Sequence, residues 1–387
     1  MKQGTICIQG CGRPKEGEPR QVPIVQSTTF RYDTSDAMGR LFNLEASGYF
    51  YSRLCNPTND TVARKITALE GGTAGLLTSS GQAAIFYALF NLANAGDHIV
   101  ASSTIYGGAY NLIATTMKKM GVDVTFIEPD WSDDQINAAF RPNTKVFYGE
   151  TLANPALVVL DLERFAKIAH SHGVPVLVDG AQATAHMAVD VQALDADFYA
   201  FSAHKMYGPS GVGVLYGKEA LLADMPPYQG GGEMIGTVSF EGTTFAELPF
   251  KFEAGTPDFV DIAAFSRTLD YLQKLGIENI AAHEQTLLEA ATAGLQQIPG
   301  LTIYGTAAHK HSVLSFLVDG ASSYDIGILL DKLGVAVRTG HHCAQPLMRR
   351  LGIEGTVRAS FAVYNTMHEV EQFVAATARV AKMFARK

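Results

Sequence analysis

Residues 174–217, VPVLVDGAQATAHMAVDVQALDADFYAFSAHKMYGPSGVGVLYG, indicate the fold of this chain more clearly than any other stretch. Three apolar runs within it, PVLVDGA, DFYAFSA and VGVLYG, have the length and residue types of buried strands. Upstream, the strand-like runs HIVASS (98–103), DVTFIEP (123–129) and KVFYGET (145–151) alternate with helical patterns. Strands and helices in turn predict an α/β fold with a doubly wound, mostly parallel sheet.

The length of 387 residues predicts more than one domain. Residues 1–50 are rich in Gly, Pro and polar residues and are expected to form an N-terminal arm, followed by a large domain over residues 51–255. Beyond Gly255 the pattern changes to one long helical stretch, Pro257 to Gln297, and then to short strands and helices. This change predicts a smaller α+β domain over residues 256–387.

Composition and charge exclude several function classes. The net charge is −8 and there is no long run of Lys and Arg, so no nucleic-acid partner is expected. No apolar run approaches the roughly 20 residues of a membrane span, so no membrane association is expected. The four cysteines match neither a disulfide scaffold nor the paired spacing of a zinc site, and no metal is expected. The first residues lack a signal-peptide pattern, which favours a cytoplasmic protein that acts on small molecules.

Polar residues follow the predicted strands where an open α/β sheet binds ligands. Asp179 follows PVLV, Lys205 follows DFYAF, and Gly81 and Gln82 open a predicted helix. Pyridoxal 5′-phosphate (PLP) needs a lysine for a Schiff base, a carboxylate at its ring nitrogen and N–H donors for its phosphate. Each residue alone has a structural alternative, since Asp179 can cap a helix and Lys205 can lie on the surface. Their occurrence together predicts a PLP enzyme with its imine on Lys205.

The first half of the chain resembles the Cys/Met-metabolism PLP enzymes, especially the O-acetylhomoserine sulfhydrylases. The resemblance is carried by PIVQSTTFRYDTSDAMGRLFNLEASGYFYSRLCNPTNDTVARKITALEGG (23–72), LLTSSGQAAIFYALFNLANAGDHIVASSTIYGG (76–108) and ETLANP (150–155). It covers the chain to about Asp179. This family has the aminotransferase-like PLP fold of type I, which the resemblance therefore implies.

From Asp179 onward the chain resembles the cysteine desulfurases of the sulfur-mobilisation type and the related selenocysteine lyases. The matching motifs lie in VDGAQATAHMAVDVQALDADFYAFSAHKMYGPSGVGVLYGKEALL (178–222), PPYQGGGEMI (226–235), FEAGTP (252–257), RTGHHCAQPLM (338–348) and VRASFAVYNT (357–366). These enzymes share the same fold and cofactor. A change of family at Asp179 predicts a recombinant of the two families.

The two resemblances imply roles for the matching residues around PLP. Asp179 would face the ring nitrogen, and Gln182 and Asn154 would lie near the ring hydroxyl, close to Glu150. Tyr106 takes the position whose ring stacks on the cofactor in the Cys/Met family, where desulfurases have a histidine. The phosphate would be bound from a helix start and from the strand before the lysine, by Gly81, Gln82, Ser202 and His204.

The resemblances also imply an assembly. Tyr51 and Arg53, in the YSR motif of the first family, would reach the phosphate of a neighbouring subunit. Thr256, in the GTP motif of the second family, would do the same. A site shared in this way predicts a homodimer.

Cys343 separates the candidate functions. In the desulfurase family the cysteine of RTGHHCAQP attacks the substrate sulfur and becomes a persulfide. The resemblance therefore implies Cys343 as a catalytic residue beside Lys205, with Arg358 and Arg338 at the substrate and Arg358 on its carboxylate. Arg338 and the neighbouring His341 and His342 are expected to favour a thiolate. The alternative is a buried structural thiol, and Cys7, Cys11 and Cys55 are assigned no chemistry.

Three functions follow from these observations. The leading one converts L-cysteine, or selenocysteine, to alanine and passes sulfur from Cys343 to a sulfur-acceptor protein. The second is O-acetylhomoserine sulfhydrylation or a γ-elimination, in which nothing needs Cys343. The third is a folded PLP-binding scaffold without turnover.

Overall fold

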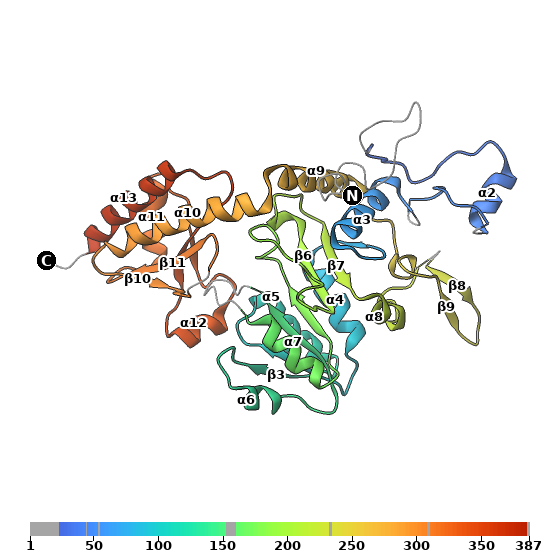
Figure 1. Ribbon diagram of the computed structural model, residues 1–387, viewed down its shortest axis with the longest axis horizontal. Coiled ribbons are helices and arrows are strands. Elements are labelled where there is room, and N and C mark those ends of the chain that lie inside the picture. Colours follow the sequence, from blue (N-terminus) through green and yellow to red (C-terminus); the bar gives the residue numbers. More distant parts are fainter. Residues whose placement is uncertain are drawn as a thin grey trace. The chain divides into compact units, whose positions relative to one another are not determined.

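The computed structural model describes residues 23–43, 45–52, 55–151, 160–231, 234–307 and 310–384 (Figure 1). The chain forms two compact units. The first unit contains the described residues up to Ala95 together with Pro175–Ala181 and Asp190–Lys274. The second contains Gly96–Val174, Gln182–Val189 and the described residues from Leu275 on. The predicted bounds of the arm and the two domains stay a prediction.

The larger sheet has seven strands in the described residues. In the first unit the order is β1-β7-β6-β5, and in the second it is β4-β2-β3. Strands β5 and β6 are parallel, as are β2 with β3 and with β4, whereas β7 is antiparallel to β6 and to β1. The bounds are β1 Leu77–Thr78, β2 His98–Ser102, β3 Asp123–Ile127, β4 Thr144–Glu150, β5 Val176–Asp179, β6 Phe198–Ser202 and β7 Gly213–Gly217. The predicted α/β fold with a mostly parallel sheet is confirmed.

Strands β2 and β5 are buried along their whole length. All residues of β2 and β5 are buried, which explains why their sequences are continuous apolar runs with no alternation. Tyr148 of β4 and Tyr199 of β6 are among the largest side chains that are fully removed from solvent. These strands place their last residues at the carboxyl edge of the sheet.

Helix α3 of the first unit begins and ends at capping residues. Asn56 accepts a hydrogen bond from the Thr58 N–H at the start of α3, Pro57 occupies the first turn, and Gly71 ends the helix in a left-handed conformation. A hairpin of β8 and β9 has no counterpart in the predicted elements. The bounds are α2 Ser35–Phe42, α3 Pro57–Glu70, α4 Gly81–Leu92, α8 Glu219–Asp224, β8 Ile235–Val238, β9 Thr243–Phe245 and α9 Phe259–Leu275.

One helix of the second unit contains a wide turn. The sequence predicts a helix from Tyr106 to Gly121, and the structure begins it as α5 (Gly107–Asn111). It continues as a π-helical segment, Leu112–Met117, whose residues Leu112, Ile113 and Met117 are buried. Helices α6 (Asp133–Asn137) and α7 (Leu162–Ser171) follow β3 and β4 along the chain.

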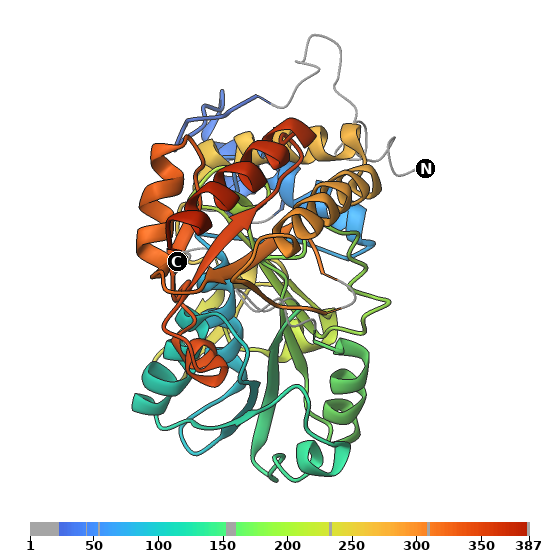
Figure 2. The ribbon, with the colours of Figure 1, turned by 90° about the vertical axis from the view of Figure 1, so that its left-hand side faces the viewer.

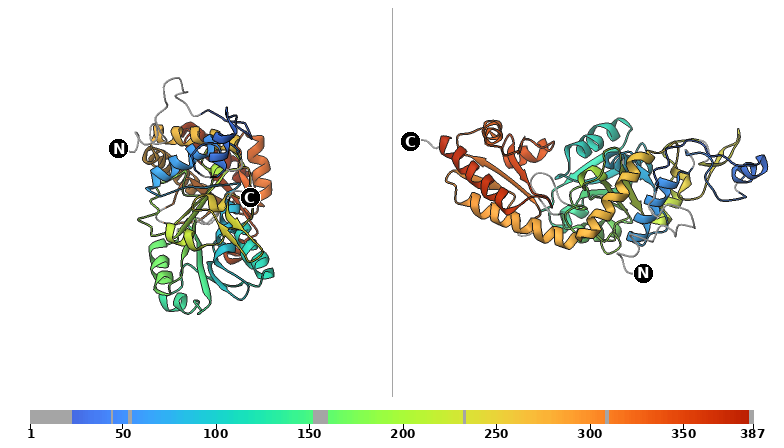
Figure 3. Two further views of the ribbon diagram at one scale, coloured as in Figure 1. Left: turned by 90° about the vertical axis from the view of Figure 1, so that its right-hand side faces the viewer. Right: turned by 90° about the horizontal axis from the view of Figure 1, so that it is seen from above.

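The smaller sheet of the second unit is antiparallel, with the strand order β10-β11-β13-β12. Helix α13 contacts both α10 and α11, and Figures 2 and 3 show α10 and α13 running alongside each other. Their apolar faces and the strands enclose one core that includes Leu314, Phe316, Val357 and Phe373. The bounds are α10 Ile277–Gln296, β10 Leu301–Tyr304, β11 Val313–Val318, α11 Ser323–Lys332, β12 Arg338–Gly340, α12 Gln345–Leu351, β13 Thr356–Ser360 and α13 Met367–Phe384. The predicted smaller C-terminal sheet is thus confirmed.

The single long helical stretch predicted from Pro257 to Gln297 is wrong in one respect. The structure divides it into α9 and α10 at Gly276, whose φ of 83° lies in the left-handed region. A side chain at this position would also lie close to the Asn279 amide. No helix in the described part of the chain is long and apolar enough to cross a membrane.

Candidate active site

The start of α4 is held against the end of β6. The Gly81 N–H donates to Ser202 Oγ at 2.7 Å, and the Ala83 N–H donates to Ser80 Oγ at 3.0 Å. A Cβ atom on Gly81 would collide with Ser202 Oγ, and one on Gly213 would collide with the backbone of Ser80. Glycine is therefore required at 81 and 213 because the two strands approach the helix start closely. The exposed Gln82 lies in the same first turn, where N–H groups and the helix dipole attract an anion.

Asp179 and Lys205 follow neighbouring parallel strands. Asp179 is the last residue of β5, only 6% exposed, and its Oδ1 accepts a hydrogen bond from the Ala181 N–H at 2.8 Å. Lys205 ends the short 3-10 turn Ala203–Lys205 that follows β6 and is half-buried. Register pairs Asp179 with Ala200 of β6, so the carboxylate and the turn that carries the lysine lie at the same edge of the sheet.

His204 lies between Ser202 and Lys205 and is exposed in the single chain. Its pKa is lowered from the usual value, first by the part of the ring that is removed from water and then by the positive charge of Lys205. A neutral imidazole at this place is a hydrogen-bond donor and not a cation.

The donor set of the first unit fits PLP. The buried Asp179 carboxylate suits a protonated ring nitrogen, since a buried charge requires a partner of opposite sign. Lys205 supplies the amine, and the Ser202 hydroxyl with the first turn of α4 supplies donors of the kind a phosphate needs. Four predicted cofactor contacts, Gly81, Ser202, Asp179 and Lys205, thus come together at one edge of the sheet.

Two predicted donors to a neighbouring subunit lie elsewhere in the first unit. Tyr51 is half-buried and forms an antiparallel bridge with Thr29, next to the buried Ser52. Thr256 is exposed and lies three residues before the start of α9. The predicted contacts Arg53 and Asn154 lie outside the described residues.

Tyr106 lies at the start of α5 in the second unit. Its backbone N–H donates to a carboxylate oxygen of Glu150, a buried residue at the end of β4. A Cβ atom on Gly108 would collide with the Tyr106 ring, so the ring lies over the first turn of its own helix. Gln182 is half-buried in the loop after β5.

Cys343 lies three residues after β12 and beside two arginines. The Arg338 Nη2 donates to the Cys343 Sγ at 3.3 Å, and Arg338 pairs with Arg358 across β12 and β13. Burial and the charge of Arg338 lower the pKa of Arg358 to about 10, so Arg358 stays charged at neutral pH. The structure thus brings together three predicted residues, Cys343, Arg338 and Arg358, around one half-buried thiol.

The expected contribution of His342 to a thiolate is wrong. His342 is 2% exposed, and its Nε2 lies 2.9 Å from Thr356 Oγ1 and 3.1 Å from the Thr356 carbonyl oxygen. Burial and the nearby Arg358 charge lower the pKa of His342 to about 4, so the ring is neutral near pH 7. The Nδ1 of His341 accepts the Cys343 N–H at 3.1 Å and does not contact the sulfur. Arg338 is therefore the positive group that contacts the sulfur.

Gly107 is a site residue that the sequence analysis missed. A Cβ atom at this position would collide with the carbonyl group of Cys343, so α5 and the Cys343 loop meet backbone to backbone. His342 and Cys343 both have left-handed φ values, 53° and 62°, which non-glycine residues rarely adopt. A strained loop of this kind requires tight packing, and the only sequence signal for the contact is the glycine pair after Tyr106.

Cys55 differs from Cys343 in its surroundings. Burial and the carboxylates of Asp60 and Glu253 raise the pKa of its thiol to about 12. It is therefore a thiol at neutral pH.

Comparisons with known proteins agree with this geometry. A model of the aminotransferase class-V family matches residues 58–373. Over 247 residues the chain is 47% identical to a cysteine desulfurase of Synechococcus elongatus, which covers 64% of this chain and 40% of that protein. Over 296 residues it is 43% identical to a cysteine desulfurase of Salmonella agona, covering 75% of this chain and 72% of the other.

A solved structure extends the likeness to most of the chain. The crystal structure of a cysteine desulfurase from Escherichia coli has a TM-score of 0.77 and 33% identity, covering 90% of this chain and 91% of that one. The chain spans only about two fifths of the length of the first relatives it matches. The chain belongs to the class-V aminotransferase family, whose members depend on PLP.

Proposed function

We propose that the chain is a PLP-dependent cysteine desulfurase, which converts L-cysteine to L-alanine and holds the sulfur as a persulfide on Cys343. The observation that carries this proposal is the contact of Arg338 with the Cys343 sulfur, next to the strand that carries Arg358. A charged guanidinium favours the anionic form of a thiol, which is its nucleophilic form. Sulfur abstraction needs a nucleophilic thiol, whereas a sulfhydrylase does not.

When bound, PLP withdraws electrons from the α-carbon of an amino acid and so lowers the cost of breaking its bonds. In the proposed reaction Lys205 carries the cofactor and then moves the α-proton on its Nζ. The buried Asp179 carboxylate holds the proton of the ring nitrogen. Arg358 binds the substrate carboxylate, a task suited to a planar guanidinium.

Cys343 carries out the sulfur transfer. Its thiolate attacks the substrate sulfur, so that an S–S bond forms as the Cβ–S bond of the substrate breaks. The carbon fragment keeps the electron pair of the broken bond and takes up a proton, which yields alanine. The outer sulfur of the persulfide then passes to a thiol of an acceptor protein.

The remaining roles belong to the same proposal. Gly81, Gln82, Ser202 and His204 would bind the phosphate, while Gln182 and Asn154 would lie near the ring hydroxyl and Tyr106 would stack on the ring. Tyr51, Arg53 and Thr256 serve the phosphate of a second copy, which makes the protein a homodimer. Its substrate is L-cysteine or selenocysteine, its partner is a sulfur-acceptor protein, and it acts in the cytoplasm.

Two reactions offered in parallel test the proposal. We expect alanine and a persulfide mass increment on the Cys343 peptide after incubation with L-cysteine, and no product from O-acetylhomoserine with sulfide. Cys343→Ala should lose both products with unchanged PLP absorbance, whereas Cys55→Ala should keep them. Product from O-acetylhomoserine that survives Cys343→Ala would favour the sulfhydrylase instead, and no product from either substrate would favour a scaffold without turnover.

A further inference from the structure

We propose that Arg350 is a positioning residue for Cys343 and acts on it through helix α12. The inference rests on the proposed function, because it concerns the residue that takes the sulfur there. Arg350 lies at the opposite end of α12 from Cys343 and is not adjacent to the thiol in the sequence.

Helix α12 connects the two residues rigidly. Cys343 is followed directly by Ala344, the residue before the first turn, whose N–H donates to the His341 carbonyl oxygen at 2.8 Å. Ala344, Leu347 and Met348 are buried together, so the helix cannot rotate without exposing them. Helix α12 has only seven residues and, at about 1.5 Å per residue, is short. We therefore expect a shift at its far end to move the Cys343 end as well.

Arg350 ties the far end of α12 to the loop after β3. Its Nη1 pairs with the Glu128 carboxylate, and its Nη2 lies 2.9 Å from Asp130 Oδ2. The same Glu128 oxygen accepts the Ser103 hydroxyl at 2.6 Å. One guanidinium thus bridges two carboxylates, one through each of its terminal nitrogens.

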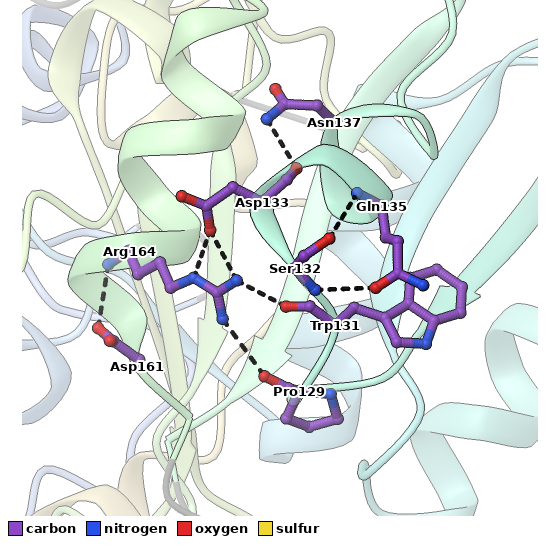
Figure 4. Close-up of polar contacts among 8 residues, drawn as sticks. All are labelled: Pro129, Trp131, Ser132, Asp133, Gln135, Asn137, Asp161 and Arg164. Atoms are coloured by element: carbon purple, nitrogen blue, oxygen red, sulfur yellow. Dashed lines mark hydrogen bonds and ion pairs between the residues drawn. The ribbon is translucent and has the colours of Figure 1, made fainter.

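The loop that receives Arg350 is itself held in place, as Figure 4 shows. Arg164 of α7 donates to the Trp131 carbonyl oxygen at 2.6 Å and to the Asp133 carboxylate at 2.7 Å. Ser132 and Gln135 close a capping box at the start of α6. Glu128 and Asp130 therefore lie next to a fixed segment, which makes them a rigid anchor for the arginine.

Apolar packing does not replace the ion pairs at this contact. A cavity of about 210 Å³ remains beside α12, lined among others by Tyr110, Phe126 and Leu347. Glu128 and Arg350 line the same space, so their ion pair lies at its wall. The polar bridge of Arg350 is then a restraint on the C-terminal end of α12 that adds to the burial of Leu347 and Met348.

The first experiment measures persulfide formation on Cys343 after one addition of L-cysteine. Arg350→Gln and Glu128→Gln should each slow this step roughly tenfold, because a misplaced nucleophile loses rate steeply with distance. The double variant should be no slower than Arg350→Gln alone, since that change already removes both ion pairs of Arg350. PLP absorbance and KM for L-cysteine should stay unchanged. Arg349→Gln is the control, since Arg349 forms no ion pair with any residue that the structure describes.

A second measurement does not depend on desulfurase activity. The measurement is the rate at which iodoacetamide alkylates Cys343 without substrate, followed by mass spectrometry. This rate should change severalfold in Arg350→Gln and not in Arg349→Gln. If the wild type makes no alanine but alkylation changes as expected, the proposed function fails and the positioning role stands. If the wild type turns over L-cysteine and Arg350→Gln matches Arg349→Gln in both measurements, the positioning role is overturned.

Discussion

Gly107 and Cys343 meet through their backbones, because a Cβ atom at position 107 would collide with the Cys343 carbonyl group. The contact joins the start of α5, where Tyr106 lies, to the loop that carries the Cys343 thiol. His342 and Cys343, in the loop before α12, both have left-handed φ values. The loop backbone therefore has little freedom to adjust if α5 is displaced. The place of the thiol therefore depends on a residue without any side chain.

Gly107→Ala should displace the Cys343 loop. We expect persulfide formation from L-cysteine to fall at least about tenfold, since small displacements of a reacting group cost rate steeply. Gly39→Ala is the matched control, because a side chain there would meet no atom within 4 Å. Equal rates for both variants would mean that the contact has no bearing on the reaction.

Lys205→Ala should lose the covalent attachment of PLP. The purified wild type is expected to be yellow, and borohydride reduction followed by peptide mapping should place the pyridoxyl group on Lys205. Lys167→Ala, a change at an exposed lysine of α7, should leave both observations unaltered. A pyridoxyl group on any other lysine of the wild type would refute the assignment.

Ser202→Ala should weaken PLP binding. The change removes the acceptor of the Gly81 N–H and a predicted phosphate donor, which we expect to cost about 1–2 kcal/mol, or roughly tenfold in Kd. Titration of the apoprotein with PLP, followed by absorbance, measures the effect. The exposed Ser79 provides the control, and Ser79→Ala should bind as the wild type does.

His342 should make the protein sensitive to acid. Its folded pKa of about 4 lies below the usual 6.5, so between these values the unfolded chain binds more protons than the folded one. The free energy of unfolding should therefore fall as the pH is lowered from 7 to 5, by an amount on the order of 2 kcal/mol from this residue. The pKa of His98 is also lowered to about 4, by burial and by the charge of Arg141. His98 therefore lowers the free energy of unfolding further over the same pH range.

Urea unfolding at pH 7 and pH 5 separates the two histidines. His342→Gln should retain a donor to Thr356 and lose only its own share of the pH dependence. In the double variant His342→Gln/His98→Gln, the free energy of unfolding should differ even less between pH 7 and pH 5. An unchanged difference between the two pH values in His342→Gln would contradict the buried, neutral state of that ring.

Much of the fold could be predicted because its signals are local. Continuous apolar runs identified β2, β4, β5 and β6, and these strands are buried on both faces. Asp179 and Lys205 could be named as candidates because strand ends in parallel sheets lie at one edge. The break at Gly276 was missed because a single glycine is often tolerated inside a helix.

The contacts around Cys343 had no such signal. Arg350 lies 222 residues from Glu128 and 220 from Asp130 along the chain, and no local pattern relates them. His342 was misjudged because a histidine next to a cysteine gives no indication of its burial, which decides whether it carries charge. Tertiary packing, and not residue type, sets the electrostatics of the loop.

The wide turn between Leu112 and Met117 limits how this part of the protein can be transplanted into another scaffold. A π-helical segment holds more residues per turn than an α-helix of the same length. Removal of one residue from it would rotate one flank by about 100° relative to the other. Either Gly107 would leave Cys343, or the buried side chains Ile113 and Met117 would turn toward solvent. A designer who grafts the thiol loop must therefore carry over this helix with its residue count intact.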